Sequence, residues 1–407
     1  MDKRILVITG MFFPSPSANG LCLDAILKEL HNHSYFAEVV SFSNIDNTLV
    51  YNYCRVHNIN TNNIIRRSKN PFLNVLNFIK IFVSYPLHKK ADLKKVFSCA
   101  KCILESNDIS FILIVQKPAS SSYIGMMLKK HWKTVPCYLY EMDSLTDNGS
   151  NFVGWKRMFK GRNRHLERRI FQKFDFIMYL KSHYDYYQRR AYKTYSNKMV
   201  CIDTPLLDKT LFEMAQTTKN ADGKSVRFMY SGVLTMASRS PESFIDFLEH
   251  LNKIIRSKCV FYVRGNAVDY IKKRSYNNNV QIIVNDYIPR DKLDLEICST
   301  DFLVSIGESF NSRAFSFPSK IIYYMSFGKP IVHFAYDKND LCIDYLTKYP
   351  LSLILFNKDG PEINAKRFTE FFDRIRFEKI DFNLIERHFY MNSPSYTVDI
   401  LLSKNKE

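Results

Sequence analysis

Short apolar runs alternate along the chain with longer stretches in which apolar residues recur at helical spacing. The run "RILVITG" at 4–10 ends in glycine and is typical of a buried strand. The stretch "LCLDAILKEL" at 21–30 predicts a helix, because its apolar residues fall on one face. Further strands of the first half are predicted at 37–43, 110–116, 136–142, 174–180 and 198–203, with helices at 155–173 and 182–193.

The second half of the chain repeats this alternation. Its predicted strands lie at 226–232, 259–265, 280–286, 301–307, 329–335 and 351–356, and a helix is expected at 240–255. Strands that alternate with helices form right-handed crossovers and parallel sheets covered by helices on both faces. The sequence therefore predicts an α/β fold with two Rossmann-like, doubly wound parallel-sheet domains.

The boundary between the two series falls in the polar stretch 206–225. We expect an N-terminal domain at 1–210, a C-terminal domain at 225–380 and closing helices at 381–407. In open sheets of this kind, ligands bind outside the carboxyl ends of the strands. With two such sheets in one chain, a cleft between the domains is the expected binding site.

Positive charge is concentrated in the first half. The 407 residues include 58 Lys and Arg against 40 Asp and Glu, a formal net charge of +18. Residues 1–210 hold 31 of the basic and 16 of the acidic residues, a net of +15, which leaves +3 for the rest of the chain. This asymmetry predicts that one domain faces a polyanion, which could be nucleic acid, anionic lipid or a phosphorylated substrate.

Cysteine content and hydropathy indicate the compartment. The chain has nine cysteines, an odd number, and its start "MDKRILVITG" does not resemble a signal peptide, so we expect free thiols in a reducing cytosol. The single CxxC, Cys99 and Cys102, lies in a predicted helix and is interpreted as structural. No apolar run approaches the roughly 18 to 20 residues of a spanning helix, so we expect none to cross a membrane.

Two loops of the first half carry candidate chemistry. The loop "GMFFPSPSANG" at 10–20 opens a helix, and its backbone amides can approach an anionic ligand, although an ordinary strand-to-helix loop has the same composition. The stretch "YEMDSLTDNG" at 140–149 places Glu141, Asp143 and Asp147 just past a strand. A carboxylate there can act as a base or bind hydroxyls, and each acid alone also fits a turn.

Strand ends of the second half carry fixed cations and glycines. Gly232 ends the first strand and permits a tight turn, and Arg239 stands just ahead of a helix that begins near Pro241. Gly265 lies at the next strand–helix junction, in "RGNA". A guanidinium in front of a helix start suits a phosphate group.

The stretch "FPSKIIYYMSFGKPIV" at 317–332 predicts a helix entered through Pro-Ser-Lys and followed by a strand. Ser319 can cap this helix and Lys320 adds a cation. Arg239, Ser319 and Lys320 together with backbone amides therefore predict a pyrophosphate site.

The segments 230–251, 280–309 and above all 317–332 resemble the C-terminal domain of GT-B glycosyltransferases of the retaining family 4 type, and 11–30 resembles the first loop and helix of that family. The resemblance implies a nucleotide-sugar donor held by the C-terminal domain and an acceptor held by the N-terminal domain. It also implies transfer with retention of configuration and without a metal, in which Arg239 and Lys320 would stabilise charge on the leaving diphosphate. For this chain it implies donor contacts from Gly232, Arg239, Gly265, Glu308, Ser319, Lys320 and Tyr323, and an acceptor-side loop containing Ser17, Asn19 and Gly20.

The aspartate spacing fits this resemblance. No two aspartates are spaced D-x-D, the arrangement with which sugar transferases of the other main fold hold manganese. We therefore expect no metal and no cofactor besides the nucleotide-sugar co-substrate. The closing segment 380–402 resembles helices that cross back toward the N-terminal domain in this family.

The sequence departs from the family pattern at several positions. The family's ribose-binding glutamate falls on Tyr323, whose hydroxyl can donate a hydrogen bond but cannot act as a bidentate acceptor. The first acid of the family's spaced pair falls near Phe315, and the earlier Glu308 can substitute for it. Val233 replaces the usual basic residue after the glycine, and Asp143 stands where many members carry a histidine.

Two basic segments with interleaved apolar residues, 64–95 and 155–173, indicate contact with an anionic membrane surface, although core-facing helices with a solvated basic face have the same pattern. Nucleic acid is disfavoured because no nucleic-acid module is recognisable. The favoured function is sugar transfer to a lipid-linked saccharide for cell-surface polysaccharide, in the cytoplasm at the inner face of the plasma membrane. The alternatives are a non-catalytic GT-B subunit or scaffold, which Tyr323 favours, and a nucleotide-sugar epimerase.

Overall fold

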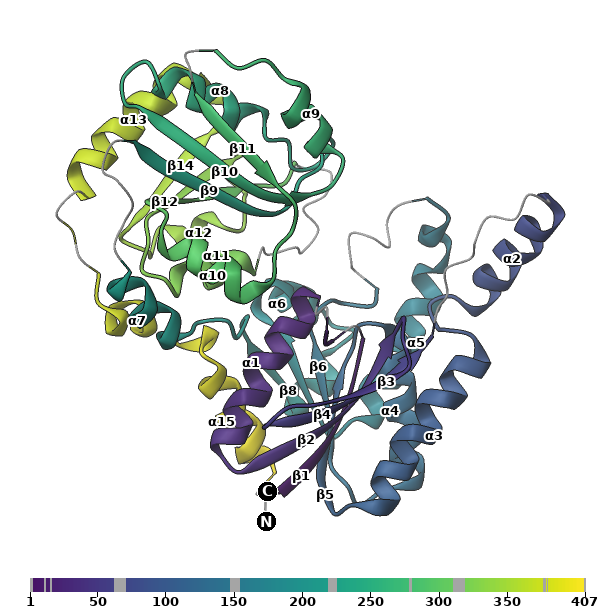
Figure 1. Ribbon diagram of the computed structural model, residues 1–407. Helices are drawn as coiled ribbons and strands as arrows, with labels where there is room; N and C mark the ends of the chain where they lie inside the picture. The colour runs from purple at the N-terminus through teal and green to yellow at the C-terminus, as the bar shows by residue number, and fades with distance from the viewer. Residues whose placement is uncertain are drawn as a thin grey trace. The chain divides into compact units, whose positions relative to one another are not determined.

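The computed structural model of the chain describes residues 3–10, 12–14, 17–61, 71–146, 154–218, 225–277, 280–309, 319–375, 378 and 380–405 (Figure 1). The chain divides into two compact units. The first comprises Met1–Pro205 and Pro394–Glu407, and the second comprises Leu206–Ser393. Each unit is built on its own sheet with helices on both faces, as the alternating pattern predicts.

The first unit contains an eight-stranded sheet in the order β3-β4-β2-β1-β5-β6-β7-β8. The strands are β1 (Lys3–Thr9), β2 (Tyr35–Ser43), β3 (Asn47–Val50), β4 (Cys54–Asn60), β5 (Ile109–Val115), β6 (Cys137–Glu141), β7 (Phe176–Leu180) and β8 (Met199–Ile202). Neighbouring strands are parallel except at the edge, where β3 pairs antiparallel with β4. The sequence pattern missed β3 and β4, because β3 is short and both strands mix polar with apolar residues.

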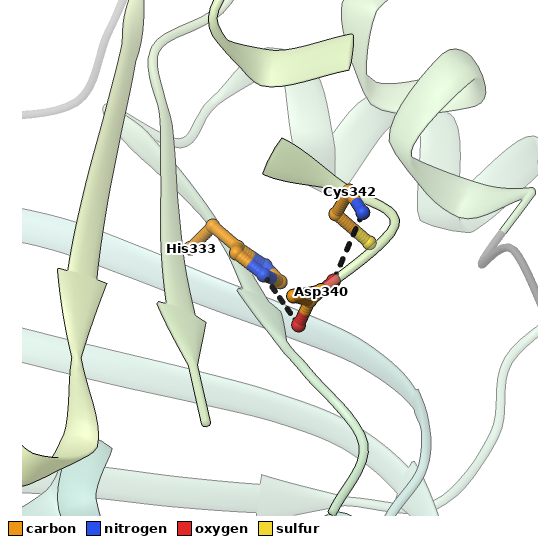
Figure 2. Close-up of side chains that lie close together, drawn as sticks. All are labelled: His333, Asp340 and Cys342. Carbon is orange, nitrogen blue, oxygen red and sulfur yellow. Dashed lines mark hydrogen bonds and ion pairs between the residues drawn. The ribbon is translucent and has the colours of Figure 1, made fainter. Parts of the chain in front are cut away.

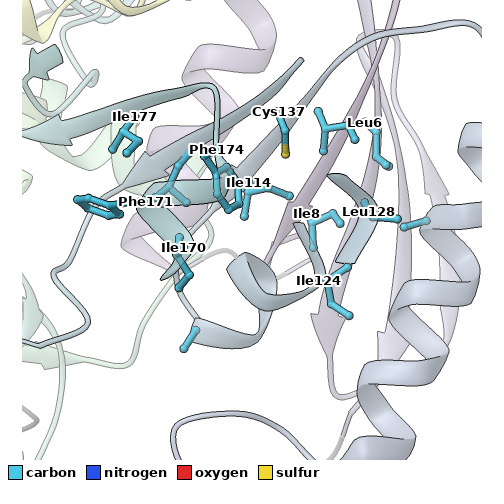
Figure 3. Close-up of a cluster of buried hydrophobic side chains, with 14 of the residues drawn as sticks. Leu6, Ile8, Ile114, Ile124, Leu128, Cys137, Ile170, Phe171, Phe174 and Ile177 are labelled. Atoms are coloured by element: carbon cyan, nitrogen blue, oxygen red, sulfur yellow. The ribbon is translucent and has the colours of Figure 1, made fainter. Parts of the chain in front are cut away.

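Helices cover both faces of this sheet. On one face lie α1 (Ala18–Asn32) and α15 (Pro394–Lys404), which pack against each other, so the closing helix returns to the first unit (Figure 1). On the other face lie α3 (Lys90–Ser106), α4 (Ala119–His131) and α5 (Lys160–Lys173). Figure 3 shows the core on this second face, where aliphatic side chains of β1, β5 and α4 interlock with aromatic ones around β7.

The second unit contains a six-stranded, fully parallel sheet in the order β11-β10-β9-β12-β13-β14. Its strands are β9 (Val226–Val233), β10 (Ser257–Arg264), β11 (Gln281–Asn285), β12 (Phe302–Ile306), β13 (Ile331–Ala335) and β14 (Ser352–Phe356). All six lie within two residues of the predicted strands at both ends. The first strand, β9, lies between β10 and β12, which is the doubly wound order.

The helices of the second unit connect these strands and close the chain. They are α7 (Lys209–Thr217), α8 (Glu242–Leu251), α9 (Ala267–Lys273), α10 (Arg290–Cys298), α11 (Lys320–Met325), α12 (Ile343–Leu346), α13 (Gly360–Ile375) and α14 (Phe382–His388). A cluster of phenylalanines, including Phe228, Phe247 and Phe368, packs α8 and α13 onto the sheet.

The helix predicted at 182–193 is wrong. The chain there forms a 3-10 turn at Lys181–His183, a single helical turn α6 (Tyr184–Tyr187) and irregular turns. Its tyrosines turn inward instead: the hydroxyls of Tyr186 and Tyr192 both donate to the buried carboxylate of Glu167. These tertiary hydrogen bonds outweigh the helical spacing of the segment.

Two expectations about cysteines and membranes can be compared with the structure. All nine cysteines are free thiols, and Cys99 and Cys102 both lie in α3. Among the described residues, no helix has the length and apolar character needed to cross a bilayer.

Candidate functional site

The loops after β9 and β12 meet where the winding of the second sheet reverses. These strands are adjacent and parallel, and each is followed by a loop at the same edge of the sheet. The loop after β9 closes into a short turn, in which the Arg239 amide donates to the Thr235 carbonyl at 2.9 Å. The Ser309 amide, just after β12, donates to the Ser238 carbonyl at 2.8 Å and joins the two loops. Ligands of doubly wound sheets bind at this reversal, so it is the candidate site.

Arg239 and Glu308 lie together at this reversal. Their side chains form an ion pair, and they are 17% and 19% exposed. The Nε of Arg239 is buried and has no hydrogen-bond partner among the described residues. The structure therefore brings together two of the residues that the sequence selects, and one N–H donor of Arg239 is not used by the protein.

Lys320 is the first residue of α11 and its ammonium is buried in the same place. The residue as a whole is partly exposed, but its Nζ atom is not accessible to solvent. The Nζ lies 3.7 Å from the ring centroid of Tyr230 and has no hydrogen-bond partner in the described part of the chain. The face of the Tyr230 ring offers a cation–π interaction. It does not accept a conventional hydrogen bond from any of the three N–H groups of the ammonium.

Burial and a neighbouring cation weaken the charged form of Lys320. Loss of solvation lowers the pKa of its ammonium well below the usual value, and the positive charge of Arg239 lowers it further. Glu308 and Cys342 raise this pKa and only partly compensate. Two cations with unused donors at one edge of a sheet form an environment that an anion would stabilise.

The two tyrosines of α11 have different roles. The hydroxyl of Tyr324 accepts from the Ser231 amide at 3.1 Å and lies 2.9 Å from the Ser231 hydroxyl, which ties α11 to β9. Tyr323 instead donates its hydroxyl to the carboxylate of Asp294 on α10. The guanidinium of Arg290 lies over the Tyr323 ring, 4.6 Å from its centroid. A carboxylate is thus present beside residue 323, although residue 323 itself is a tyrosine.

Glycine is required at one of the two predicted positions by close contact. Gly265 has φ of +114°, and a Cβ atom there would lie 2.0 Å from the Leu234 carbonyl oxygen. Gly232 has φ of +132°, which disfavours other residues, but the space beside it is open. Both glycines shape the loops that carry Arg239, and neither needs to contact a ligand to do so.

The predicted capping role of Ser319 is wrong. Ser319 already has helical dihedrals, φ −50° and ψ −24°, and its side chain makes no capping hydrogen bond. An N-cap hydroxyl reaches the first turn from an extended backbone, which Ser319 does not adopt. With α11 only six residues long, the anion-binding potential of this site depends on its side-chain cations.

Within the described ranges, His333, Asp340 and Cys342 are a group of three that could hold a metal ion (Figure 2). His333 Nε2 lies 3.1 Å from Asp340 Oδ2, and the Cys342 amide donates to Asp340 Oδ1 at 2.9 Å. Burial raises the pKa of the Asp340 carboxyl, but the hydrogen bond and charge of His333 and the hydrogen bonds from Cys342 together lower it by more, so the net shift is downward. Lys320 and Arg239 act electrostatically on Cys342, and their charge disfavours a divalent cation there. We interpret the cluster as a hydrogen-bonded support beneath Lys320.

In the first unit, the acceptor-side residues lie at the start of α1. The Ser17 hydroxyl accepts from the Gly20 amide at 3.2 Å and caps this helix. The Nδ2 of Asn19 is buried and has no hydrogen-bond partner within the described residues. Ser17 thus has a structural role in addition to the predicted one, and Asn19 retains an unused donor.

Asp143 is linked to the same edge of the first sheet. Its carboxylate forms an ion pair with Lys117 at 2.7 Å, and the Lys117 carbonyl accepts from the Gly10 amide at 3.1 Å. The loops after β1, β5 and β6 are therefore connected by these residues. Asp143 is positioned at the predicted edge, but one of its oxygens is occupied by Lys117.

Glu141, which ends β6 next to Asp143, is a further candidate at this edge of the sheet. Glu141 is fully buried, and burial followed by the nearby Glu167 raises the pKa of its carboxyl well above the usual value. Its Oε1 accepts from Gln116 at 2.9 Å and from the Tyr187 hydroxyl, while no described residue donates to its Oε2. A strand-terminal acid directly after an apolar run was the available signal.

A separate open pocket of about 560 Å³ lies at the ends of β10 and β11 and against α10. It is lined by Tyr262, Asn285, Asp286, Ile288, Lys292, Leu295 and Glu296. The pocket combines aromatic and aliphatic walls with amide and charged groups. None of the residues predicted for the site lines it.

Among the comparisons with known proteins, only the one with solved structures finds similar proteins. No protein-family model matches the sequence, and no curated protein matches it. The catalytic domain of starch synthase IV from Arabidopsis thaliana, bound to ADP and acarbose, matches with a TM-score of 0.59 at 9% identity, over 100% of both chains. The UDP-forming α,α-trehalose-phosphate synthase from Burkholderia xenovorans matches with a TM-score of 0.61 at 9% identity, over 99% of this chain and 100% of that one.

Anabaena HepE in complex with UDP and glucose matches with a TM-score of 0.55 at 12% identity, over 98% of this chain and 99% of that one. The chain has the GT-B fold. The predicted fold class is therefore confirmed. At 9–12% identity, a shared GT-B fold does not identify the functional residues of this chain. The candidate site is therefore defined by the geometry described above.

Proposed function

We propose that the chain is a glycosyltransferase that moves a sugar from a nucleotide-diphosphate donor to a saccharide acceptor. The observation that carries this proposal is the pair of cations Arg239 and Lys320 at the winding reversal of the second sheet, because the buried Nε of Arg239 and the buried Nζ of Lys320 have no hydrogen-bond partner among the described residues. A diphosphate supplies both the negative charge and the acceptor oxygens that these donors lack. The related folds with ADP or with UDP and glucose support this donor class.

In this proposal the leaving diphosphate is stabilised by Arg239 and Lys320 and not by a metal. Charge accumulates on the β-phosphate as the glycosidic bond to the donor breaks, and fixed cations in a dry site stabilise that charge more than water does. Transfer is proposed to retain the anomeric configuration, with the acceptor hydroxyl attacking from the face that the diphosphate leaves. Catalysis then consists mainly of positioning and charge stabilisation.

Donor binding is expected to rearrange the Arg239–Glu308 ion pair. Glu308 occupies the guanidinium in the described structure. A diphosphate carries more charge and competes for the same N–H donors, so Glu308 is proposed to turn toward a donor hydroxyl. This exchange keeps Arg239 neutralised whether or not the donor is present.

We propose that Asp294 supplies the ribose-binding carboxylate missing from position 323. Asp294 accepts from the Tyr323 hydroxyl, and the ring of Tyr323 is covered by Arg290. A carboxylate offers about four acceptor sites, so the hydrogen bond from Tyr323 is compatible with a further one from a ribose hydroxyl. The loss of glutamate at 323 is thereby compatible with donor binding.

The acceptor is proposed to be a lipid-linked oligosaccharide bound at Ser17, Asn19, Gly20 and Asp143. The basic character of the first half supports a position on an anionic membrane surface. The protein would then work in the cytoplasm at the inner face of the plasma membrane, in cell-surface polysaccharide assembly. Nucleic acid is not proposed as a partner.

The test is calorimetric titration with UDP, GDP, CDP and ADP and their sugars in EDTA, on the wild type and on Lys320→Ala. Binding of one nucleotide that Lys320→Ala weakens by about thirtyfold supports the proposal, since a hydrogen bond to a charged group contributes about 2 kcal/mol. A requirement for added metal would refute the metal-independent mechanism.

The second candidate is a non-catalytic GT-B subunit or scaffold that binds a partner transferase or the membrane. The observation in its favour is Tyr323 in place of a carboxylate. Absence of binding by every nucleotide at millimolar concentration, in a protein that is folded by circular dichroism, would favour this candidate over the enzyme.

A further inference from the structure

The helix α2 (Pro71–Ser84) exposes apolar side chains along most of its length. Lys80 is the one charged residue in its sequence, PFLNVLNFIKIFVS. Seven apolar side chains are between 37% and 68% exposed: Phe72, Leu73, Val75, Leu76, Phe78, Ile79 and Val83. An exposed apolar surface of this density marks a binding surface in a folded protein.

The C-terminal end of α2 is fixed to the rest of the first unit. The Phe82 ring packs edge-on against Phe159, with 4.6 Å between centroids. The Arg162 guanidinium donates to the Val83 carbonyl at 3.0 Å. These contacts join α2 to the 3-10 helix Gly154–Phe159 and to α5, and Met158 beside them is 75% exposed. The apolar surface is therefore held on the folded unit.

The segments that contain or contact α2 carry many exposed cations, which we call the basic rim. Residues 71–90 and 154–173 contain eleven Lys or Arg and a single acid, Glu167. Glu167 is buried and binds the loop at 144–146, so it does not offset the surface charge. Ten of the eleven cations are exposed: Lys80, Lys89, Lys90, Arg157, Lys160, Arg162, Arg164, Arg168, Arg169 and Lys173.

We propose that α2 and Met158 insert into the interfacial region of an anionic lipid bilayer, while the basic rim binds the lipid headgroups. The apolar surface fits acyl chains and the rim fits lipid phosphates, which is the pattern of helices that lie in a membrane interface. A second copy of this chain would bring two positive rims together, so charge disfavours self-association. Nucleic acid would match the rim but would leave the aliphatic side chains of α2 in water.

This inference deepens the membrane association in the proposed function, and it does not depend on the donor site. Nucleotide titration and vesicle binding can therefore fail separately. A protein that binds vesicles but no nucleotide would keep this inference and lose the transferase proposal.

The test is flotation of the full chain with vesicles of phosphatidylcholine alone or with 30% phosphatidylglycerol. Ile79→Asp is compared with Ile363→Asp, a change at a similarly exposed isoleucine on α13 of the second unit, where Ile79 is 50% and Ile363 51% exposed. Ile79→Asp is expected to weaken binding by about tenfold or more, and Ile363→Asp to leave it unchanged. Replacing Arg164 and Arg168 with Gln is expected to weaken binding roughly fivefold per charge, with Lys366→Gln as control.

Insertion and purely electrostatic binding are distinguished by a Phe72→Trp variant. If α2 inserts, lipids brominated in the acyl chains are expected to quench the fluorescence of the tryptophan introduced at position 72. Binding that high salt abolishes, with no such quenching and no effect of Ile79→Asp, would overturn the proposal. A dimer that Ile79→Asp dissociates, in a protein that floats with neither vesicle, would also overturn it and assign the surface to a second copy of the chain.

Discussion

Replacing Lys320 with methionine should stabilise the free protein and weaken nucleotide binding. The Nζ of Lys320 is buried without a hydrogen-bond partner among the described residues, and its pKa is lowered well below the usual value by burial and then by Arg239. Leaving a buried polar group unsatisfied costs about 1–3 kcal/mol. The cation–π contact with the Tyr230 ring offsets about 0.5–2 kcal/mol of this cost.

Methionine keeps most of the aliphatic stem of Lys320 and removes the unsatisfied ammonium. The expected result is a gain of about 1 kcal/mol in the free energy of unfolding, or about 2–4 °C in Tm for a domain of this size. In wild type, a nucleotide at a hundred times its Kd adds about 2.7 kcal/mol. We expect Lys320→Met to lose most of that increment, because the anion loses one of its two cations.

Lys329→Met is the matched control. Lys329 is also buried in the second unit, but its Nζ donates to the Cys298 carbonyl at 2.7 Å. Its replacement should destabilise the protein by about 2 kcal/mol and leave the nucleotide-induced shift intact. Differential scanning calorimetry with and without UDP measures both quantities. If Lys320→Met destabilises the protein as much as Lys329→Met does, the ammonium of Lys320 is satisfied in the native state and the anion-site reasoning is wrong.

The remaining predictions concern protons, the donor carboxylate and a loop glycine. The pKa of Lys320 is lowered in the free protein and a diphosphate should raise it, so binding is expected to take up a proton and to weaken as pH rises between those two pKa values. Calorimetry in buffers of different ionisation enthalpy measures this uptake, and observed heats that do not depend on the buffer would contradict it. Asp294→Asn should weaken nucleoside-diphosphate binding by roughly tenfold, because a hydrogen bond from ribose to a charged carboxylate is lost. Pyrophosphate has no ribose, so its binding should not change. An equal loss for both ligands would place Asp294 outside ribose recognition. Gly265→Ala should destabilise the protein by about 3 kcal/mol or more, because φ is +114° and the Leu234 oxygen leaves no room. Gly161→Ala, in α5 with nothing within 4 Å, should stabilise it by roughly 0.5–1 kcal/mol; denaturant titration compares the two, and a shift of the same sign in both would refute the packing argument.

The sequence alone determined the α/β class, the two strand–helix series and the strands of the second sheet. This succeeded because a strand buried on both faces needs a continuous apolar run, and such a run is visible without knowledge of its neighbours. Arg239, Glu308 and Lys320 could be selected because each lies in a segment that follows a parallel strand, and such segments share one edge of the sheet. The mixed strands β3 and β4 lacked that signal.

Tertiary structure decided what these residues do. Lys320 is unusual because Tyr230, distant in sequence, covers its ammonium, and Tyr323 gains a carboxylate because α10 brings Asp294 beside it. The helix expected at 182–193 is replaced by turns because Glu167 binds its tyrosines. Each of these outcomes depends on a contact between residues far apart in the chain, and local periodicity contains no information about such contacts.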